Sequence, residues 1–114
     1  MKIKSLILIL AILFAGAASA QSKKAEVIKI KTSAECEMCK KKLETELAFE
    51  KGIKFCKVDL DSKVASITYS PDKTSPEKIK NAISKIGYDA DEVKADSVAY
   101  EQLPECCKKG GHPK

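Results

Sequence analysis

The sequence predicts a small α+β domain whose elements follow the order β-α-β-β-α-β. Residues 26–31, 53–60 and 64–69 alternate apolar and polar side chains, as half-buried strands do. Residues 39–51 and 75–86 instead repeat apolar side chains at the spacing of amphipathic helices. In an antiparallel sheet with two helices on one face, the apolar side of each strand and of each helix can pack against the other layer. This is the ferredoxin-like β-α-β-β-α-β sandwich.

The first strand and the first helix have clear apolar faces. Ile28 and Ile30 share one face of the strand. After a loop without periodicity, Leu43 and Leu47 recur four residues apart among lysines and glutamates. We expect Leu43 to face the core, and we expect the helix to end at Gly52, a residue that suits the left-handed position after a helix.

The middle strands are predicted to form a hairpin through the polar residues 61–63. Cys56 falls on the apolar face of its strand, so it is expected to pack in the core. The second helix should begin at Ser75, an N-cap residue that is followed by proline, and should end at Gly87. Residues 88–93 are expected to supply a fourth strand.

The N-terminal segment has the three parts of a secretory signal peptide. Residues 1–20 comprise a basic start, a nearly unbroken apolar run and an A-x-A motif. Cleavage after Ala20 would place the protein in the periplasm or outside the cell, with no stable membrane insertion afterwards. A retained anchor is the alternative, although a transmembrane helix needs about 20 apolar residues and no cleavage motif.

The mature chain divides into a domain over 21–94 and a C-terminal tail over 95–114 that contains cysteine and histidine. The tail is expected to hold a turn or two of helix over 96–103, which Pro104 ends. A mature chain this short forms one domain with a small core and has no room for a deep catalytic cleft.

The composition excludes several classes of function. The chain has 21 lysines, no arginine and few aromatic residues, and recognition of bases and phosphates relies on arginine and stacking rings. We therefore expect no nucleic-acid partner. The sequence contains no Ser/His/Asp set, paired acids in a pocket or phosphate-binding loop. These observations predict a monomer that is not an enzyme.

The chemistry that the sequence offers lies mainly in Cys36 and Cys39. This C-x-x-C pair stands where the loop meets the first helix, so both thiols can face one ion. The helix N-terminus and the lysines that follow favour the thiolate form. Thiolates prefer soft ions, and two of them suit Cu(I) or Hg(II), whereas Zn(II) usually takes four ligands.

The same pair supports two other interpretations. A C-x-x-C at a helix start is also the arrangement of thiol–disulfide redox proteins, so a periplasmic redox protein is the first alternative. That motif, however, is expected in a parallel βαβ unit. The second alternative is an interaction module whose thiols are incidental or form a local disulfide.

The tail carries further candidate ligands in the adjacent pair Cys106 and Cys107 and in His112. Adjacent cysteines chelate one ion poorly because their side chains diverge, so a flexible end with paired thiols is one interpretation. The other is a lid that adds ligands to the first site and permits tetrahedral Zn(II) or Cd(II). Met38, inside the C-x-x-C, is expected to shield the thiols or to act as an accessory ligand.

The motif and the element order resemble those of the heavy-metal-associated domain family, which includes small copper chaperones, periplasmic mercury-binding proteins and modules of metal-pumping ATPases. The resemblance covers about residues 26–93. The matching stretches are Cys36-x-x-Cys39, Leu43-Glu44 with Leu47, Gly52-Ile53, Val58-Asp59-Leu60, Ala65-x-Ile67-x-Tyr69, Ser75-Pro76-Glu77-x-Ile79, Ala82-Ile83 and Gly87-Tyr88-x-Ala90. The family usually has methionine two residues before its first cysteine, where this chain has Ala34.

The resemblance implies a function and a set of ligands. Cys36 and Cys39 would bind the heavy-metal ion, which would pass to a membrane metal transporter or another metal-binding domain by exchange of thiolates. The predicted export makes the chain most similar to the periplasmic mercury-binding members. Tyr88 matches a position near the metal loop, and a ring that simply packs on the helix end is the other interpretation.

Overall fold

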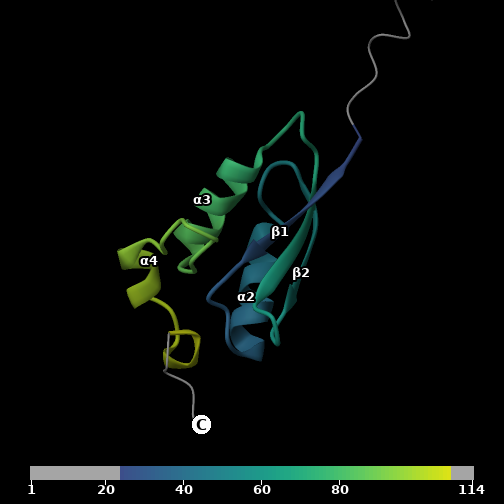
Figure 1. Ribbon diagram of the computed structural model, residues 1–114. Coiled ribbons are helices and arrows are strands. Elements are labelled where there is room, and N and C mark those ends of the chain that lie inside the picture. The colour runs from purple at the N-terminus through teal and green to yellow at the C-terminus, as the bar shows by residue number, and fades with distance from the viewer. Residues whose placement is uncertain (1–23, 109–114) are drawn as a thin grey trace, which may run out of the picture.

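The computed structural model describes residues 24–108, and its centre is a three-stranded antiparallel sheet with two longer helices packed against it (Figure 1). The strands are β1 (Glu26–Lys31), β2 (Ile53–Asp59) and β3 (Val64–Tyr69), in the spatial order β1-β3-β2. The helices are α2 (Glu37–Leu47) and α3 (Pro76–Ile86). A short helix, α4 (Ser97–Glu101), and a 3₁₀ turn, η1 (Glu105–Cys107), follow them. The predicted signal peptide and His112 lie outside the described residues.

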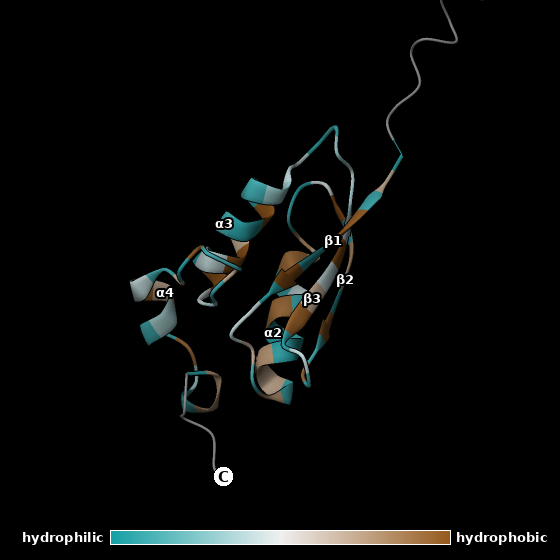
Figure 2. Cartoon of the chain, in the orientation of Figure 1, coloured by the Kyte–Doolittle hydropathy of each residue, from teal (hydrophilic) through white to brown (hydrophobic). Residues whose placement is uncertain are grey.

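The core lies on one face of the sheet. Ala65 of β3 stands opposite Ile30 of β1 on one side and Val58 of β2 on the other, and all three are fully buried. Leu43 of α2 and Ile83 of α3 are buried in the same cluster. Figure 2 shows hydrophobic residues along the strands and on the side of α3 that faces the sheet. The two helices therefore cover one face, as the sequence predicted, and Leu43 is in the core.

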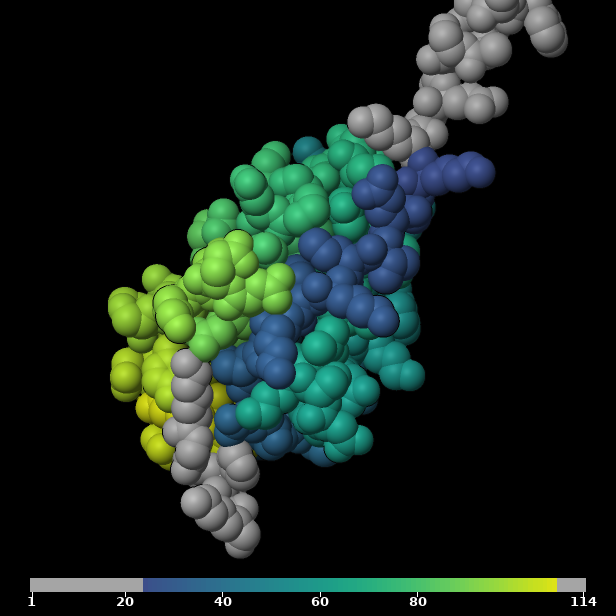
Figure 3. Space-filling view, viewed as in Figure 1, coloured from purple at the N-terminus to yellow at the C-terminus, as the bar shows by residue number. Residues whose placement is uncertain are grey.

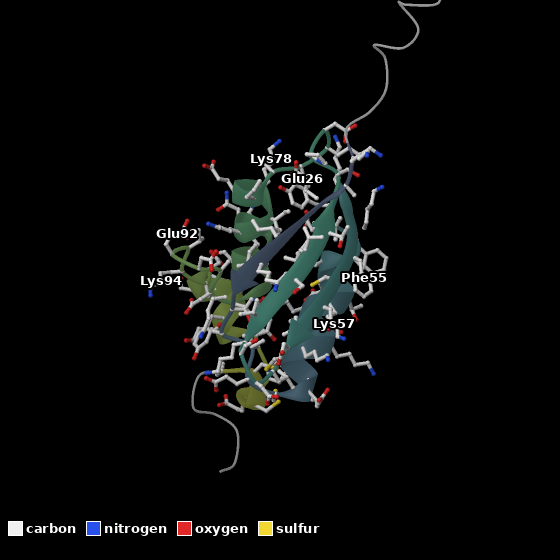
Figure 4. The ribbon with its side chains drawn as sticks, turned by 45° about the vertical axis from the view of Figure 1, so that its right-hand side comes forward. Glu26, Phe55, Lys57, Lys78, Glu92 and Lys94 are labelled. Carbon is white, nitrogen blue, oxygen red and sulfur yellow. The ribbon has the colours of Figure 1, made fainter. Side chains whose placement is uncertain are left out.

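The opposite face of the sheet is exposed. Phe55 and Lys57 of β2 both project away from the core, and Phe55 is 61% exposed (Figure 4). Cys56, between them in the chain, points inward and is buried, which confirms its predicted place in the core. Its register partner is Ile67 of β3.

Helix α2 begins earlier than the sequence predicted. Its first residue is Glu37, because Cys36 is the N-cap and the Cys36 sulfur accepts a hydrogen bond from the Cys39 backbone N–H at 3.4 Å. Cysteine is not among the usual N-cap residues, so the sequence offered no sign of this start. The consequence is that Cys36 caps the helix and Cys39 lies in its first turn.

Helix α2 also ends earlier than predicted, with Ala48 as its C-cap. The N–H of Glu50 then bonds to the carbonyl only three residues back, which tightens the chain into a turn. Gly52 has φ +85° and leads the chain into β2 instead of ending the helix. A side chain there would come within 2.8 Å of Thr74, so the position requires glycine for space as well as for conformation.

The second helix matches its prediction. Ser75 is the N-cap of α3, and its hydroxyl accepts a hydrogen bond from the Lys78 N–H at 3.3 Å. Pro76 occupies the first helical turn, where its missing N–H costs nothing. Gly87 ends the helix in the left-handed conformation, with φ +119°.

The predicted fourth strand over residues 88–93 is wrong, although the fold class is confirmed. Ala90 and Val93 exchange both backbone hydrogen bonds at 2.9 Å, which folds the segment into a tight turn with Asp91 at φ +50°. Asp91 also binds the end of β1, because its carboxylate accepts the Lys31 N–H and its own N–H donates to the Lys31 carbonyl, both at 2.8 Å. The segment touches β1 at its end and then turns away, so only isolated bridges remain.

After this turn the chain runs along the helices toward the start of α2. The helix predicted before Pro104 is α4, which packs against α3, and η1 packs against α2. Leu103 and Cys107 are buried in this packing. Figure 3 shows the C-terminal segment (yellow) lying against the α2 region (blue). Within residues 24–108, no helix combines the length and apolarity needed to cross a membrane.

Candidate metal site

Cys36 and Cys39 lie where the loop after β1 enters α2. Their sulfur atoms are 2.8 Å apart, farther than the about 2.05 Å of a disulfide bond, and both residues are free thiols. Cys39 is fully buried, and Cys36 is partly buried. The two thiols face each other at the positively polarised end of a helix, where the unpaired N–H groups favour bound negative charge.

The loop that carries Cys36 is fixed at its base by the hairpin between β2 and β3. The Thr32 hydroxyl donates to the Lys63 carbonyl at 3.0 Å and accepts the Ala34 N–H at 3.2 Å. The Lys63 ammonium group forms an ion pair with Glu35 at 3.2 Å. Ala34 itself is fully buried. These contacts tie both sides of the loop to the sheet and so hold Cys36 in place.

The C-terminal segment brings two more cysteines to the pair. The Cys107 sulfur is 3.9 Å from the Cys36 sulfur and 4.0 Å from the Cys106 sulfur, and these three atoms all lie within 4.8 Å of one another. The Cys106 carbonyl accepts a hydrogen bond from the Cys36 thiol at 3.2 Å. The Met38 sulfur is 3.6 Å from that of Cys106. We call these four cysteines, Cys36, Cys39, Cys106 and Cys107, the thiol cluster.

The surroundings of the thiol cluster shift the pKa values of its thiols in different directions. Burial opposes ionisation of Cys36, but hydrogen bonds from Cys39, Cys106 and Cys107 outweigh burial and lower the pKa of Cys36. Burial raises the pKa of Cys107, and contact with Cys39 adds to the rise. Burial and the hydrogen bond to Cys36 also raise the pKa of Cys106. Cys36 therefore ionises more readily than the two tail cysteines.

Tyr88 lies on the buried side of the site, next to Cys39 and Cys107. Its side chain is fully buried, and burial followed by the neighbouring sulfurs of Cys107 and Cys39 raises the pKa of its hydroxyl. The hydroxyl lies beside these sulfurs without a well-formed hydrogen bond to any residue from 24 to 108. Both sequence interpretations of Tyr88 hold, because the ring packs in the core and its polar end faces the thiols.

Sequence reasoning identified all the cysteines of this site but missed two of its polar groups. The Cys106 carbonyl could not be identified, because a main-chain acceptor leaves no signal in the residue types. The approach of Tyr88 to Cys107 was also missed, since it depends on how the tail returns across the domain. The proline stop at Pro104, with two cysteines beginning two residues later, was the available sign that the tail has a defined conformation.

Comparisons with known proteins agree with this geometry. The model of the heavy-metal-associated domain matches residues 31–89, which is just over half of the chain. Copper-transporting ATPase 1 of Mus musculus is 38% identical over 64 residues, which cover 56% of this chain but only 4% of the ATPase. The copper chaperone CopZ of Staphylococcus haemolyticus is 35% identical over 54 residues, covering 47% of this chain and 79% of the chaperone.

Solved structures show the same fold. A CopZ metallochaperone superimposes with a TM-score of 0.54 at 26% identity, covering 57% of this chain and 98% of the chaperone. Oxidised MerP from Ralstonia metallidurans CH34 superimposes with a TM-score of 0.56 at 19% identity, covering 59% of this chain and 94% of MerP. The family match, the C-x-x-C at the start of α2 and the shared fold lead to one conclusion. The chain belongs to the heavy-metal-associated domain family.

Proposed function

We propose that the protein is an exported carrier that binds one soft metal ion, Cu(I) or Hg(II), through Cys36 and Cys39. The observation that carries this proposal is the pair of facing thiols at the start of α2, one of which has a lowered pKa. Membership of the heavy-metal-associated family supports metal binding and transfer, and the similarity to MerP and to copper chaperones supports these two ions. The signal-like residues 1–20 support export.

Transfer would proceed by exchange of sulfur ligands. A thiol of the receiving protein loses its proton as its sulfur bonds to the ion, which gives a three-coordinate intermediate. Cys36 or Cys39 then leaves and takes up a proton, and a second exchange completes the transfer without free ion. A membrane metal transporter or another metal-binding domain is the receiving partner that we propose. The similarity to the metal-binding part of a copper-transporting ATPase supports this choice.

A metal-uptake measurement tests the proposal. The chain beginning at Gln21 should bind one equivalent of Cu(I) or Hg(II) under reducing conditions, and the Cys36→Ser/Cys39→Ser variant should not. Cys56→Ser is the matched control, because Cys56 is buried in the sheet outside the thiol cluster. Full uptake by the double variant would show that these two cysteines are not the ligands. Export is tested separately by the mass of protein recovered from the periplasm or medium, which should begin at Gln21.

The 2.8 Å distance between the two sulfurs also suits a thiol–disulfide redox site, which is the second candidate. The two functions differ in turnover. A redox protein would catalyse reduction or oxidation of a disulfide substrate, whereas a metal carrier would give no turnover above that of free dithiol. Catalysis that disappears in Cys36→Ser would favour the redox function over ours.

A further inference from the structure

We propose that the C-terminal segment completes a four-sulfur site in which the thiol cluster binds one four-coordinate soft divalent cation, Zn(II) or Cd(II). This inference rests on the proposed function, because it uses Cys36 and Cys39 as two of the four ligands. It goes further by assigning Cys106 and Cys107 to the same ion. It also adds four-coordinate divalent cations to the ions that the protein can hold when the tail is closed.

The sulfur–sulfur distances carry the inference. Around one ion with metal–sulfur bonds of about 2.3 Å, neighbouring sulfurs lie about 3.8 Å apart in a tetrahedron, about 4.0 Å apart in a triangle and about 4.6 Å apart in a line. The Cys36–Cys107 and Cys106–Cys107 distances are 3.9 and 4.0 Å. The third pair, Cys36 and Cys106, lies within 4.8 Å. Two of the three distances among sulfurs from distant parts of the chain therefore already match one ion of coordination number three or four.

Cys39 supplies the fourth sulfur. It is buried 2.8 Å from the Cys36 sulfur and close enough to Cys107 to influence its ionisation, but it stands outside the set of three sulfurs that already lie within 4.8 Å of one another. The 2.8 Å separation is shorter than any two sulfurs on one ion, so Cys39 would have to move about 1 Å away from Cys36 on binding. Cys39 is in the first turn of α2, so the movement that the site requires is a rotation about its side-chain bond.

The tail is held in the position that this site needs. Adjacent cysteines usually diverge, but η1 bends the chain so that both sulfurs reach the same side, and the Cys107 N–H donates to the Pro104 carbonyl at 2.8 Å. Leu103 and Cys107 are both at most 5% exposed. Lys108 forms ion pairs with Glu101 and Glu105 across the end of the segment. These contacts order the two cysteines before any ion arrives, which reduces the entropy cost of binding.

Tyr88 gives an independent sign that negative charge belongs here. A buried hydroxyl without a hydrogen bond is costly, and such groups usually have an explanation in function. The Tyr88 hydroxyl is fully buried and lies beside the sulfurs of Cys39 and Cys107. When a cation converts these thiols to bound thiolates, the hydroxyl gains an acceptor and donates to it. In this way Tyr88 acts as a positioning residue for the metal ligands.

Binding at this site has a defined balance of atoms and charge. A divalent cation displaces one proton from each thiol that it binds, so four protons leave for solvent and the site carries a net charge of −2. Two-thiolate binding of the same ion would release two protons and leave a neutral site. Linear Hg(II) is already satisfied by Cys36 and Cys39, so it gains little from the tail. A tetrahedral ion loses half of its ligands without the tail.

The test compares the chain beginning at Gln21 with its Cys106→Ser/Cys107→Ser variant under reducing conditions. Serine keeps the size of the side chains, so η1 can remain packed, and Cys56→Ser is the matched control. Competition titrations, carried out separately with Cd(II) and with Hg(II), give the affinity of each protein for each ion. Loss of one supporting group outside the ligand set costs about 10–100-fold in metal affinity, so loss of two ligands should weaken Cd(II) by about 100-fold or more. We expect Hg(II) affinity to change by less than about tenfold.

Cadmium-113 NMR of the unaltered chain keeps the inference testable if the serine variant does not fold. The shift of bound cadmium rises with each thiolate ligand, so it distinguishes four sulfurs from two. Tyr88→Phe should keep four sulfurs but weaken Cd(II) by about tenfold, the effect of losing a donor to a ligand. A two-sulfur signal, equal Cd(II) affinity in parent and tail variant, or equal losses for both ions would overturn the inference. Binding of neither Hg(II) nor Cu(I) by the unaltered chain would instead overturn the proposed function.

Discussion

The Cys36 thiol donates a hydrogen bond to the main-chain carbonyl of Cys106, 70 residues away in the chain, at 3.2 Å. The same carbonyl lies 3.7 Å from the Cys39 sulfur, so it sits over both members of the C-x-x-C pair. Cys39 is consequently fully buried. Under the proposed function, a receiving protein that exchanges ligands with this pair would first have to displace the C-terminal segment.

We therefore predict that deletion of residues 104–114 speeds transfer of Hg(II) to a competing dithiol. In the loaded protein Cys36 has no proton for the Cys106 carbonyl, so the segment is held over the pair by the burial of Cys107; exposing this side chain costs about 1 kcal/mol, and removal of that barrier corresponds to about fivefold in rate. Stopped-flow absorbance of the dithiol complex measures the exchange. Lys57→Ala, on the exposed opposite face of the sheet, is the control and should transfer at nearly the parent rate. Equal rates for the deletion and the parent would show that the segment does not limit access.

Leu43→Ala should lower the free energy of unfolding by about 2–4 kcal/mol, because it leaves a cavity in a fully buried part of the core. Urea unfolding followed by circular dichroism measures the loss. Thr45→Ala on the exposed side of the same helix is the matched control and should change the stability by less than about 0.5 kcal/mol. A Leu43→Ala variant that melts within about a degree of the parent would contradict the place of Leu43 in the core.

Glu44 joins helix α2 to the edge strand of the sheet. Its carboxylate accepts a hydrogen bond from the Val58 N–H of β2 at 2.8 Å, and β2 is an edge of the sheet that residues 24–108 form. Glu44→Ala should therefore cost about 1–3 kcal/mol, because it leaves this partly buried N–H without its acceptor. Glu44→Gln should restore most of the loss, since the amide oxygen can still accept.

The control for Glu44 is Glu46→Ala on the same helix. Glu46 is exposed and forms only an ion pair with Lys42, so its loss should cost about 0.5 kcal/mol or less. Equal losses at the two positions in urea unfolding would mean that the bond to β2 contributes nothing specific.

Most of the fold could be predicted because its signals are local. The alternation along β1, β2 and β3 and the Ser75 cap with the Gly87 stop of α3 depend only on neighbouring residues. The start of α2 was missed because a cysteine sulfur replaces the usual oxygen cap. The fourth strand was wrong because the tight turn at Asp91 is stabilised by a bond to Lys31, which lies 60 residues earlier. Tertiary contacts of this kind leave no periodic pattern.

The functional site likewise has one part that could be predicted from local sequence and one part that depends on tertiary contacts. The C-x-x-C pair follows from residue type and spacing alone, so its position could be predicted. The approach of Cys107 to Cys36 depends on the path of the chain through α4 and on the burial of Leu103. The sequence could therefore present the tail cysteines only as one of two alternatives. The structure brings them to the pair, and His112 remains outside the described residues.

Cys56 should make the stability depend on pH in the alkaline range. Burial, with a smaller contribution from the charge of Glu44, raises the pKa of Cys56 to about 11, whereas an unfolded thiol titrates near 8.5. The native state thus holds this proton more tightly than the unfolded state does, so stability falls as pH rises between these values. The expected loss by pH 11 is about 3 kcal/mol.

Urea unfolding of the parent and of Cys56→Ala at several pH values from 8 to 11 isolates this contribution, because all other groups titrate in both proteins. The stability advantage of the parent over Cys56→Ala should shrink steadily across that range as the thiol of the unfolded chain ionises. Val58→Ala, which removes a buried apolar group from the same strand, should instead differ from the parent by a constant amount. Parallel curves for the parent and Cys56→Ala would contradict the raised pKa and with it the burial of this thiol against the charge of Glu44.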